Sequence, residues 1–211
     1  MAQVTALIDA NNFYASCEQS LDPALIGRPV VVLSNNDGCI VARSAEARAL
    51  GIAMGTPYFK AKQTLERCGV VVRSSNYALY ADMSQRLMSL LESQVEELEV
   101  YSIDEAFARI SRPAAADLRP WGRQLRALVR RNLGLPIAIG LGASKGQAKL
   151  ANRLAKVEAS HAGLFDLGHC SHQDRWLETI AIEDVWGIGR KLADWCRLRG
   201  VRNARELRDM A

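Results

Sequence analysis

Two adjacent carboxylates, Asp104 and Glu105, stand between two apolar runs, and this placement constrains the fold more than any other feature. The runs at 98–100 and 106–110 carry β-branched and aromatic residues, which predicts a β-hairpin with both acids at its tip. Neighbouring strand residues point to opposite faces, so the two acids can share a ligand only if the chain turns there or a cation lies between them. The alternative is an acidic turn that is merely solvated.

A third carboxylate, Asp9, follows the apolar run 4–8, which predicts a short buried strand. Taken alone, an aspartate there would more often cap the next helix. Hard divalent cations take oxygen ligands, and two Mg²⁺ ions about 3.5–4 Å apart can bind the attacking and leaving oxygens of a phosphoryl transfer. Three acids at strand ends therefore favour two-metal nucleotidyl transfer. Such clustered acids repel one another, so at least one should have a raised pKa.

Composition predicts a globular chain without a membrane segment. Its 211 residues can form one large domain or two small ones, and 49% of them are hydrophobic. No apolar run approaches the length of a membrane span, and no signal peptide opens the sequence, so we expect a cytoplasmic protein. An odd number of scattered cysteines predicts reduced thiols; these are Cys17, Cys39, Cys68, Cys170 and Cys196.

The charges are segregated along the chain, although the net charge is only +4. No acidic residue occurs from 119 to 156, a span with many arginines and lysines, whereas every charge from 92 to 105 is acidic. This pattern favours a surface that meets a polyanion beside a pocket that collects cations. A solvated basic face is the alternative, and nucleic acid is the preferred interpretation.

The order of elements predicts an α+β fold with a ferredoxin-like palm. After the first strand we expect a helix from Phe13, a strand at 30–33, a helix over 40–51 and a strand at 70–72. A long helix, the acidic hairpin, a helix over 121–132 and a strand at 136–141 follow. Without the inserted lobe this order gives a split βαβ sheet with helices on one face.

Several side chains next to these elements are expected to face the pocket or to bind phosphate. Phe13 and Tyr14 differ by about 100° around their helix, so at most one can face the core and the other should face the pocket. Arg48 is either a nucleotide clamp or the partner of Glu46 or another acid in a surface ion pair. The helix over 145–156 places Lys149, Arg153 and Lys156 on the face opposite its leucines, where they can reach phosphate.

The C-terminal part carries two further patterns. His161, His169, Cys170 and His172 match no ordinary zinc spacing, so a polar surface loop is preferred over a metal site. The stretch 185–192 alternates apolar residues and glycines, which predicts a helix-hairpin-helix whose backbone N–H groups approach a DNA phosphate. Its proposed DNA-binding residues are Gly187, Gly189, Arg190 and Lys191. The alternative is a simple turn between helices.

From Ile8 to Met210 the sequence closely resembles the Y-family translesion DNA polymerases, and within that family the UmuC type, the catalytic subunits of bacterial DNA polymerase V. The most specific stretches are FYASCE at 13–18, LSNNDGC at 33–39, SSNY at 74–77, LYADMS at 79–84 and YSIDEAF at 101–107. The resemblance implies a polymerase shaped like a right hand, with a palm, small fingers and a thumb. It assigns 1–13 and 77–163 to the palm, 14–76 to inserted fingers and 164–211 to a partial thumb with the helix-hairpin-helix. We expect no little-finger domain within this chain.

The resemblance also implies roles for individual residues. Asp9, Asp104 and Glu105 match the catalytic metal-binding acids, with the Ala10 carbonyl as a further ligand; Tyr14 matches the steric gate against a ribose 2′-hydroxyl, beside Phe13; Arg48 and Lys156 match the triphosphate contacts. Many members carry a tyrosine where this chain has Ala45, so one common phosphate contact is missing.

The implied activity is nucleotidyl transfer to a primer 3′-hydroxyl in SOS DNA repair, with two Mg²⁺ ions per site. Primer-template DNA and deoxynucleoside triphosphates are the implied partners, and a longer form would also engage a UmuD-type accessory protein, RecA and a sliding clamp. Without a little finger, DNA binding should be weak and strongly salt-dependent. Two alternatives stay open: a palm-fold nucleotide cyclase, and a catalytically idle scaffold in the DNA-damage response.

Overall fold

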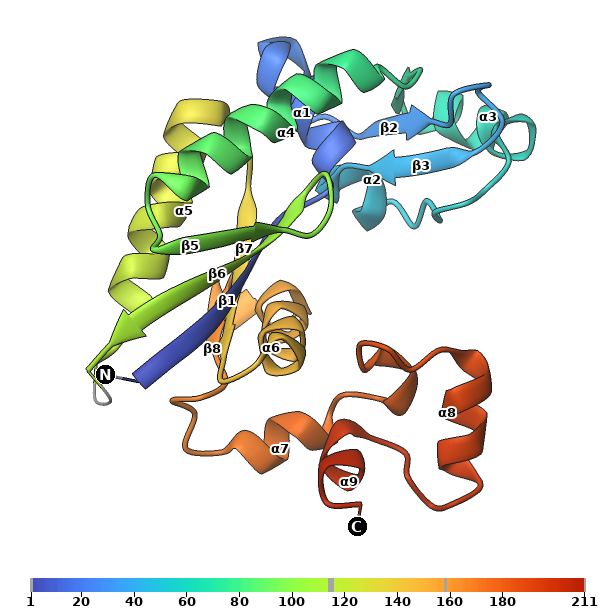
Figure 1. Ribbon diagram of the computed structural model, residues 1–211. Helices are drawn as coiled ribbons and strands as arrows, with labels where there is room; N and C mark the ends of the chain where they lie inside the picture. Colours follow the sequence, from blue (N-terminus) through green and yellow to red (C-terminus); the bar gives the residue numbers. More distant parts are fainter. Residues whose placement is uncertain (1, 114–115, 158, 211) are drawn as a thin grey trace.

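A five-stranded sheet forms the centre of the computed structural model, which describes residues 2–113, 116–157 and 159–210 (Figure 1). Its strand order is β5-β6-β1-β7-β8, and β1 pairs antiparallel with both β6 and β7. The strands are β1 (Ala2–Ala10), β5 (Glu97–Val100), β6 (Glu105–Arg112), β7 (Ile137–Gly142) and β8 (Leu164–Asp166). The succession β1, α4, β5, β6, α5, β7 confirms the predicted split βαβ arrangement of an α+β protein.

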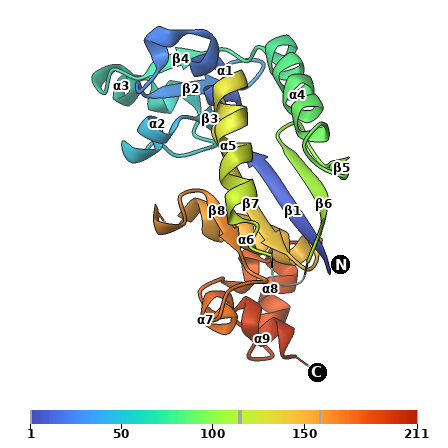
Figure 2. The same cartoon turned by 90° about the vertical axis from the view of Figure 1, so that its left-hand side faces the viewer.

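Helices cover both faces of this sheet, whereas the sequence predicted helices on one face. Helices α4 (Tyr77–Glu92) and α5 (Arg119–Leu133) lie on one side, and α6 (Lys145–Val157) lies on the other (Figure 2). The alternation of β1 explains both layers: Ile8 packs in the core with α4 and α5, while Leu7 packs with Ala148 of α6.

The close approach of α6 depends on Gly140. A Cβ at this position would lie 2.1 Å from the backbone nitrogen of Asn152, so only glycine fits between β7 and α6. The Asn152 amide donates to the carbonyls of Leu7 and Ala138 at 3.3 and 3.0 Å. The helix is thereby fixed over the strand that carries Asp9.

A three-stranded sheet of order β3-β2-β4 forms a smaller unit beside the end of β1. Its strands are β2 (Val30–Leu33), β3 (Ile40–Arg43) and β4 (Val71–Arg73), and its helices are α1 (Phe13–Leu21), η1 (Pro23–Leu25), α2 (Ala45–Ala49) and α3 (Tyr58–Arg67). The helix predicted over 40–51 is wrong in its first half. The β-branched residues of 40–43 pair with β2, and Ser44 caps the short α2 by accepting from the Ala47 N–H.

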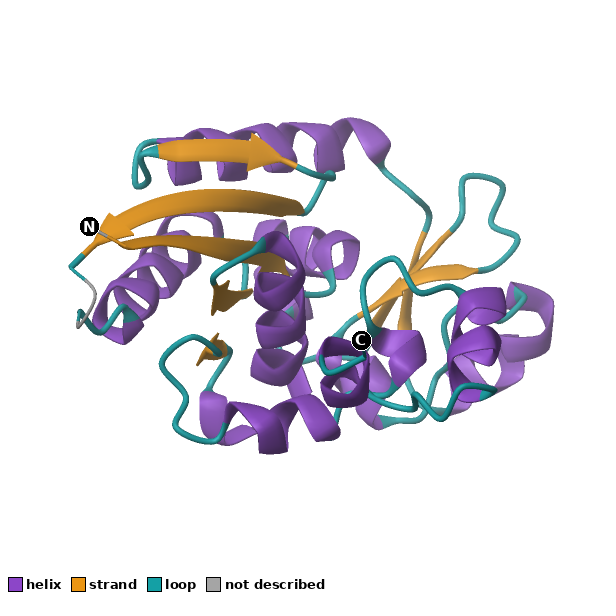
Figure 3. Cartoon of the chain, turned by 60° about the horizontal axis from the view of Figure 1, so that its bottom comes forward, coloured by secondary structure: helices purple, strands orange, loops and turns teal. Residues whose placement is uncertain are grey.

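The C-terminal part consists of short helices that lie toward the bottom of Figure 1 and come forward in the view of Figure 3. They are η2 (Ala159–His161), α7 (Gln173–Glu178), η3 (Ile182–Asp184), α8 (Arg190–Arg197) and α9 (Ala204–Arg208). Strand β8 lies where the sequence predicted a polar loop, and all three of its residues are buried against the sheet. The predicted boundary between palm and thumb at 163/164 therefore falls just before a strand of the larger sheet.

Two predictions from composition can be compared with the structure. All five cysteines are free thiols, as expected. Among the described residues, no helix combines the length and the apolar character that a membrane crossing requires. The division into palm, fingers and thumb remains a prediction.

Candidate active site

Strand register brings two of the predicted acids together. Asp9 of β1 lies directly opposite Glu105 of β6 in the antiparallel ladder. Opposed residues point to the same face, with Cβ atoms about 4.5–5.5 Å apart. The face is the one covered by α6, because Leu7 and Phe107, two residues away along each strand, pack there with Ala148. Acids separated by 96 positions in the sequence are thus neighbours.

The third acid, Asp104, lies in the turn between β5 and β6. The Ser102 hydroxyl donates to Asp104 Oδ1 at 2.7 Å and accepts from the Glu105 N–H at 3.1 Å. The Ala10 N–H donates to the Asp104 carbonyl at 2.9 Å, which fixes the turn against the end of β1. Because Asp104 lies in a turn and not in a strand, the alternation of strand residues does not force Asp104 and Glu105 to opposite faces of the sheet.

Two lysines of α6 neutralise acids on β1 and β6. Lys156 Nζ lies 2.5 Å from Asp9 Oδ2, and Lys149 Nζ lies 3.0 Å from Glu105 Oε2. The two lysines are seven residues, or about two turns, apart and so share one helix face. Arg153, the third cation predicted on this face, pairs with Asp184 at 2.5 Å. The three cations of α6 that were expected to reach phosphate are therefore all bound to carboxylates in this arrangement.

Burial dominates the electrostatics of Asp9, which is only 6% exposed. Burial raises the pKa of Asp9 to about 6, although the Lys156 ammonium lowers it; the adjacent Glu105 carboxyl adds to the rise. The sequence predicted a raised pKa from mutual repulsion. The direction is confirmed, but loss of hydration is the larger cause.

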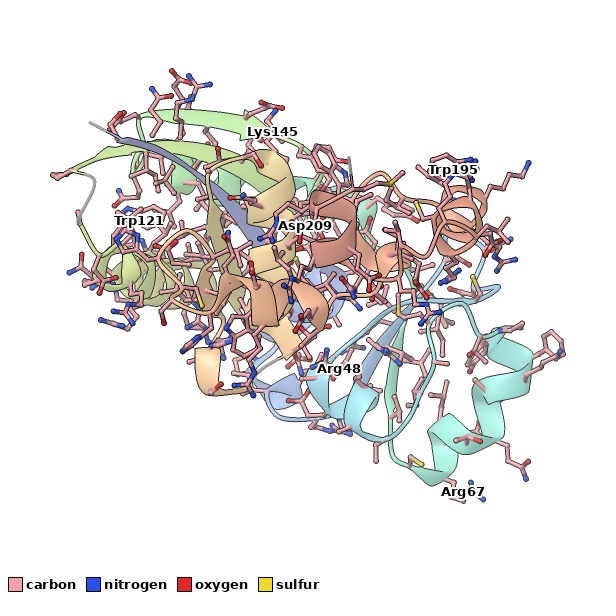
Figure 4. The ribbon with its side chains drawn as sticks, turned by 90° about the horizontal axis from the view of Figure 1, so that it is seen from below. Arg48, Arg67, Trp121, Lys145, Trp195 and Asp209 are labelled. Atoms are coloured by element: carbon pink, nitrogen blue, oxygen red, sulfur yellow. The ribbon has the colours of Figure 1, made fainter. Side chains whose placement is uncertain are left out.

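A cavity of about 450 Å³ opens beside Asp9 and Asp104, whereas Glu105 is not among the residues that line it. Asp9, Ala10 and Asp104 line one side, and Phe13, Tyr14, Arg48 and Lys156 complete the predicted residues around it; Asn12, Val41, Ala42, Arg43, Met54 and Ile103 line the rest. Arg48 extends from α2, on the side of the small unit that faces the large sheet (Figure 4). Among the described residues it makes no ion pair with Glu46, so the ion-pair alternative is not what the structure shows.

Tyr14 is held by two further tyrosines. Its ring stacks on Tyr80 with centroids 4.3 Å apart, and Tyr77 meets it edge-on at 6.1 Å. The Tyr80 hydroxyl donates to Glu18 at 2.8 Å, which anchors the stack. Burial raises the pKa of Tyr14, and the nearby Asp104 carboxylate raises it further. Phe13 is buried in the core, as the helical spacing predicted for one member of the pair.

An aromatic cage surrounds the Lys149 ammonium and joins the acidic turn to the C-terminal helices. The ammonium lies 4.3 Å from the ring centroid of Tyr101 and 5.5 Å from that of Trp186. Trp186 Nε1 also donates to the Tyr101 hydroxyl at 3.3 Å. Trp186 precedes α8, so this contact places the predicted DNA-binding loop next to Glu105.

The loop itself is exposed. Gly187 has φ +87°, in the left-handed region, and a Cβ there would meet no atom within 4 Å, so its backbone is open to a ligand. Gly189, Arg190 and Lys191 are exposed as well, at the start of α8. The element before the loop is the single turn η3 rather than a longer helix, so the helix-hairpin-helix assignment remains a prediction.

The donor chemistry of the site fits hard divalent cations, because it combines carboxylate oxygens with the Ala10 backbone at one cavity wall. The side chains are not assembled around one point, however. Within the part of the chain that the structure describes, no three acidic, histidine or cysteine side chains are grouped closely enough to hold one ion. Asp104 accepts a hydrogen bond from Ser102, and Asp9 and Glu105 form ion pairs with lysines. Metal binding therefore requires these acids to exchange their present partners for the ions.

The sequence missed three residues that organise the site. Ser102 precedes Asp104 by two positions, a spacing typical of a hydroxyl that bonds its own turn, and this signal was available. Lys149 was assigned to phosphate rather than to Glu105, and Trp186 was given no role. Their partners become visible only when the strand register and the position of α6 are known.

A family model and several known proteins match the chain. The model described as the impB/mucB/samB family matches residues 8–153. Protein UmuC of Salmonella typhimurium is 49% identical over 208 residues, which are 98% of this chain and 49% of that protein. DNA polymerase IV of Corynebacterium diphtheriae is 35% identical over 186 residues, 86% of this chain and 40% of that protein.

The structure of DinB from Sulfolobus solfataricus matches with a TM-score of 0.79 at 24% identity, covering 99% of this chain and 60% of that one. At this identity the likeness establishes the fold. The chain spans about half the length of the curated relatives it matches.

Proposed function

The chain belongs to the impB/mucB/samB family, and from this membership and the geometry of the site we propose that it is a DNA-templated DNA polymerase of the Y-family translesion type, similar to UmuC, acting in SOS DNA repair. The observation that carries the proposal is the register that opposes Asp9 to Glu105, with Asp104 beside them in the cavity wall. A cavity with acids at one side and Arg48 and Lys156 at others suits a nucleoside triphosphate.

Each residue group has a proposed task. Asp9, Asp104, Glu105 and the Ala10 carbonyl are the proposed ligands of two Mg²⁺ ions, which would supply charge for the attacking and leaving oxygens of phosphoryl transfer. Arg48 and Lys156 bind the β and γ phosphates, and this requires Lys156 to leave Asp9. Tyr14, fixed by its stack on Tyr80, lies under the incoming sugar and excludes a 2′-hydroxyl, with Phe13 supporting it from the core.

The proposed DNA contacts are sequence-independent. Gly187 and Gly189 present backbone N–H groups to a phosphate, and Arg190 and Lys191 add charge at the start of α8. Primer-template DNA and deoxynucleoside triphosphates are the proposed partners. A UmuD-type accessory protein, RecA and a sliding clamp are proposals that rest on the resemblance alone.

Primer extension tests the proposal. The 211-residue chain is incubated with a primer-template, the four deoxynucleoside triphosphates and Mg²⁺ at low salt, on an undamaged template and on one with an abasic site. We expect template-directed extension on both templates and none when a chelator replaces Mg²⁺. Formation of a cyclic nucleotide from a triphosphate without DNA would instead identify a cyclase, and DNA binding without extension would identify a scaffold.

A further inference from the structure

A second cavity, of about 540 Å³, lies on the edge of the sheet formed by β8, away from the acids. It is lined by residues of α5, of the segment from η2 to β8, of the loop that leads to α7 and of α7 itself. Figure 2 shows how these elements are arranged. Trp121 in the first turn of α5 marks this end of the molecule, opposite Trp195 of α8 (Figure 4). Its volume falls within the range of about 300–1,000 Å³ that is typical of small-molecule sites.

Three arginines of α5 line one wall at i, i+4 and i+7, namely Arg119, Arg123 and Arg126. Arg126 is half-buried: its Nε donates to the Ile137 carbonyl at 2.8 Å, and its guanidinium packs against Gly163, where a Cβ would lie 2.7 Å from Nη2. No described carboxylate forms an ion pair with it. A partly buried cation without a counter-ion costs free energy, which an anionic ligand would recover.

The other arginines differ in their partners. Arg123 is exposed and has neither an ion pair nor a hydrogen bond with any residue that the structure describes. Arg119 pairs with Asp117 at 2.9 Å on the rim. Asp166 also lines the cavity, where it accepts from the His169 N–H at 3.1 Å. Its charge acts on Arg119, and Asp117 interacts electrostatically with Arg119 and Arg123. Among the described residues neither acid forms an ion pair with Arg123 or Arg126.

The opposite wall is aromatic. His161, Phe165 and Trp176 pack together, with centroids 4.4 Å apart for His161 and Phe165 and 5.5 Å apart for Phe165 and Trp176. Phe165 is buried, whereas Trp176 keeps part of its surface at the cavity. His161 Nε2 is out of contact with solvent and has no hydrogen-bond partner among the described residues. A flat ring can stack against this wall.

We propose that this cavity is a second nucleotide site, which holds the phosphate between Arg123 and Arg126 and the base against Trp176 and His161. Paired guanidinium groups match phosphate oxygens in number and direction, and the rings select a ligand that carries an aromatic base. The site is separate from the candidate active site and needs no metal. It stands whether or not the chain is a polymerase.

Calorimetric titration with adenosine 5′-monophosphate in the presence of a chelator tests the site. We expect saturable binding of one molecule to the 211-residue chain, with adenosine and inorganic phosphate each binding at least about 10-fold more weakly because each lacks one half of the recognition. Arg123→Gln should weaken binding about 10-fold or more. Arg123 is exposed and forms no ion pair or hydrogen bond with a described residue, so we expect Arg123→Gln to fold. The site can therefore be tested with this variant even if Arg126→Met is unstable.

Arg48→Ala is the matched control, since it removes an arginine from the other cavity. Binding of adenosine 5′-monophosphate should be unchanged in this variant, and Trp176→Leu should weaken it as Arg123→Gln does. The proposal is overturned by the absence of saturable binding, by wild-type affinity in Arg123→Gln, or by loss of binding in Arg48→Ala.

Discussion

The lysines at the candidate active site and two arginines of the second cavity differ in how their charge is balanced. At the candidate active site Lys156 and Lys149 each contact an acid from a neighbouring strand, at 2.5 and 3.0 Å. In the cavity beside α5, Arg123 and Arg126 contact no described carboxylate. An ion pair within the chain fixes the positions of both partners. The charges of Arg123 and Arg126, which form no such pair among the described residues, are available to an anion from outside the chain.

Because of this difference, ligand binding should require different side-chain movements in the two cavities. A ligand of the acids competes with ammonium groups that are already in place, so binding there requires lysines to exchange partners. An anion entering the arginine cavity breaks no ion pair of Arg123 or Arg126 among the described residues. The predictions below test this distinction, beginning with the largest expected effect.

Asp104→Ala should lower primer extension by roughly 100- to 1,000-fold or more, because it removes a proposed oxygen ligand of the Mg²⁺ ions. The fold should survive, since Asp104 lies in a turn and no described lysine or arginine pairs with it. Extension rates and circular dichroism check both parts. Asp82→Ala, which removes an exposed acid paired with Arg86 on α4, is the control and should keep full activity. Near wild-type extension by Asp104→Ala would refute the assignment.

Asp9 should make stability depend on pH in a direction opposite to that of an ordinary salt-bridged acid. Its pKa is raised from 3.8 to about 6 in the folded state, so the folded chain binds the proton more tightly than the unfolded chain. The stabilisation is full below pH 4 and is lost as pH rises through about 6, by up to about 3 kcal/mol. Urea unfolding in a chelator, from pH 4 to 8, measures it.

The comparison with Asp9→Asn isolates this contribution. The variant carries no titrating group at position 9, so its free energy of unfolding should exceed that of the wild type at pH 8 and approach it at pH 4. A constant difference across this range would show that Asp9 is not the group responsible.

Tyr14→Ala should reduce discrimination against ribonucleotides by about 10- to 100-fold, because it removes the cavity-lining ring that we propose to lie under the incoming sugar. The ratio of incorporation rates for deoxy- and ribonucleoside triphosphates measures the effect. Tyr77→Ala is the matched control: this tyrosine touches the edge of Tyr14 but does not line the cavity. If both variants discriminate equally, the ring acts through packing rather than as a barrier.

Much of the larger sheet could be predicted because its signals are local. The apolar run before Asp9, the hairpin around Asp104 and the buried strand after residue 136 each carry the periodicity of their element, and the structure contains all three. The helix predicted over 40–51 was wrong in its first half because β3, which contains Ile40 and Val41, pairs with β2, a contact that local helix propensity does not report.

The acids of the candidate site could be predicted from the sequence, but the side chains that pair with them could not. Asp9 and Glu105 could be named from their positions at strand ends, but the register that opposes them and the lysines that bind them depend on long-range packing. Strand β8 and the arginine cavity were missed for the same reason. Three residues after a glycine give too weak a pattern, and Arg126 acquires its significance only when β8 and Gly163 close over it.

The last prediction compares two ion pairs of α6, one partly buried and one exposed, by the stability lost when each lysine is replaced. Lys149→Met keeps an apolar stem within the aromatic cage but leaves Glu105 without its ammonium, and the side chains of this pair are only 17% and 21% exposed. We expect unfolding to become easier by about 1–3 kcal/mol, because a half-buried carboxylate loses its partner. Lys145→Met breaks the pair with Glu99, whose side chains are 42% and 58% exposed, and should cost less than about 1 kcal/mol. Urea unfolding midpoints of the two variants at one pH and salt concentration give the comparison, and equal losses would show that the cage does not shield the pair from solvent.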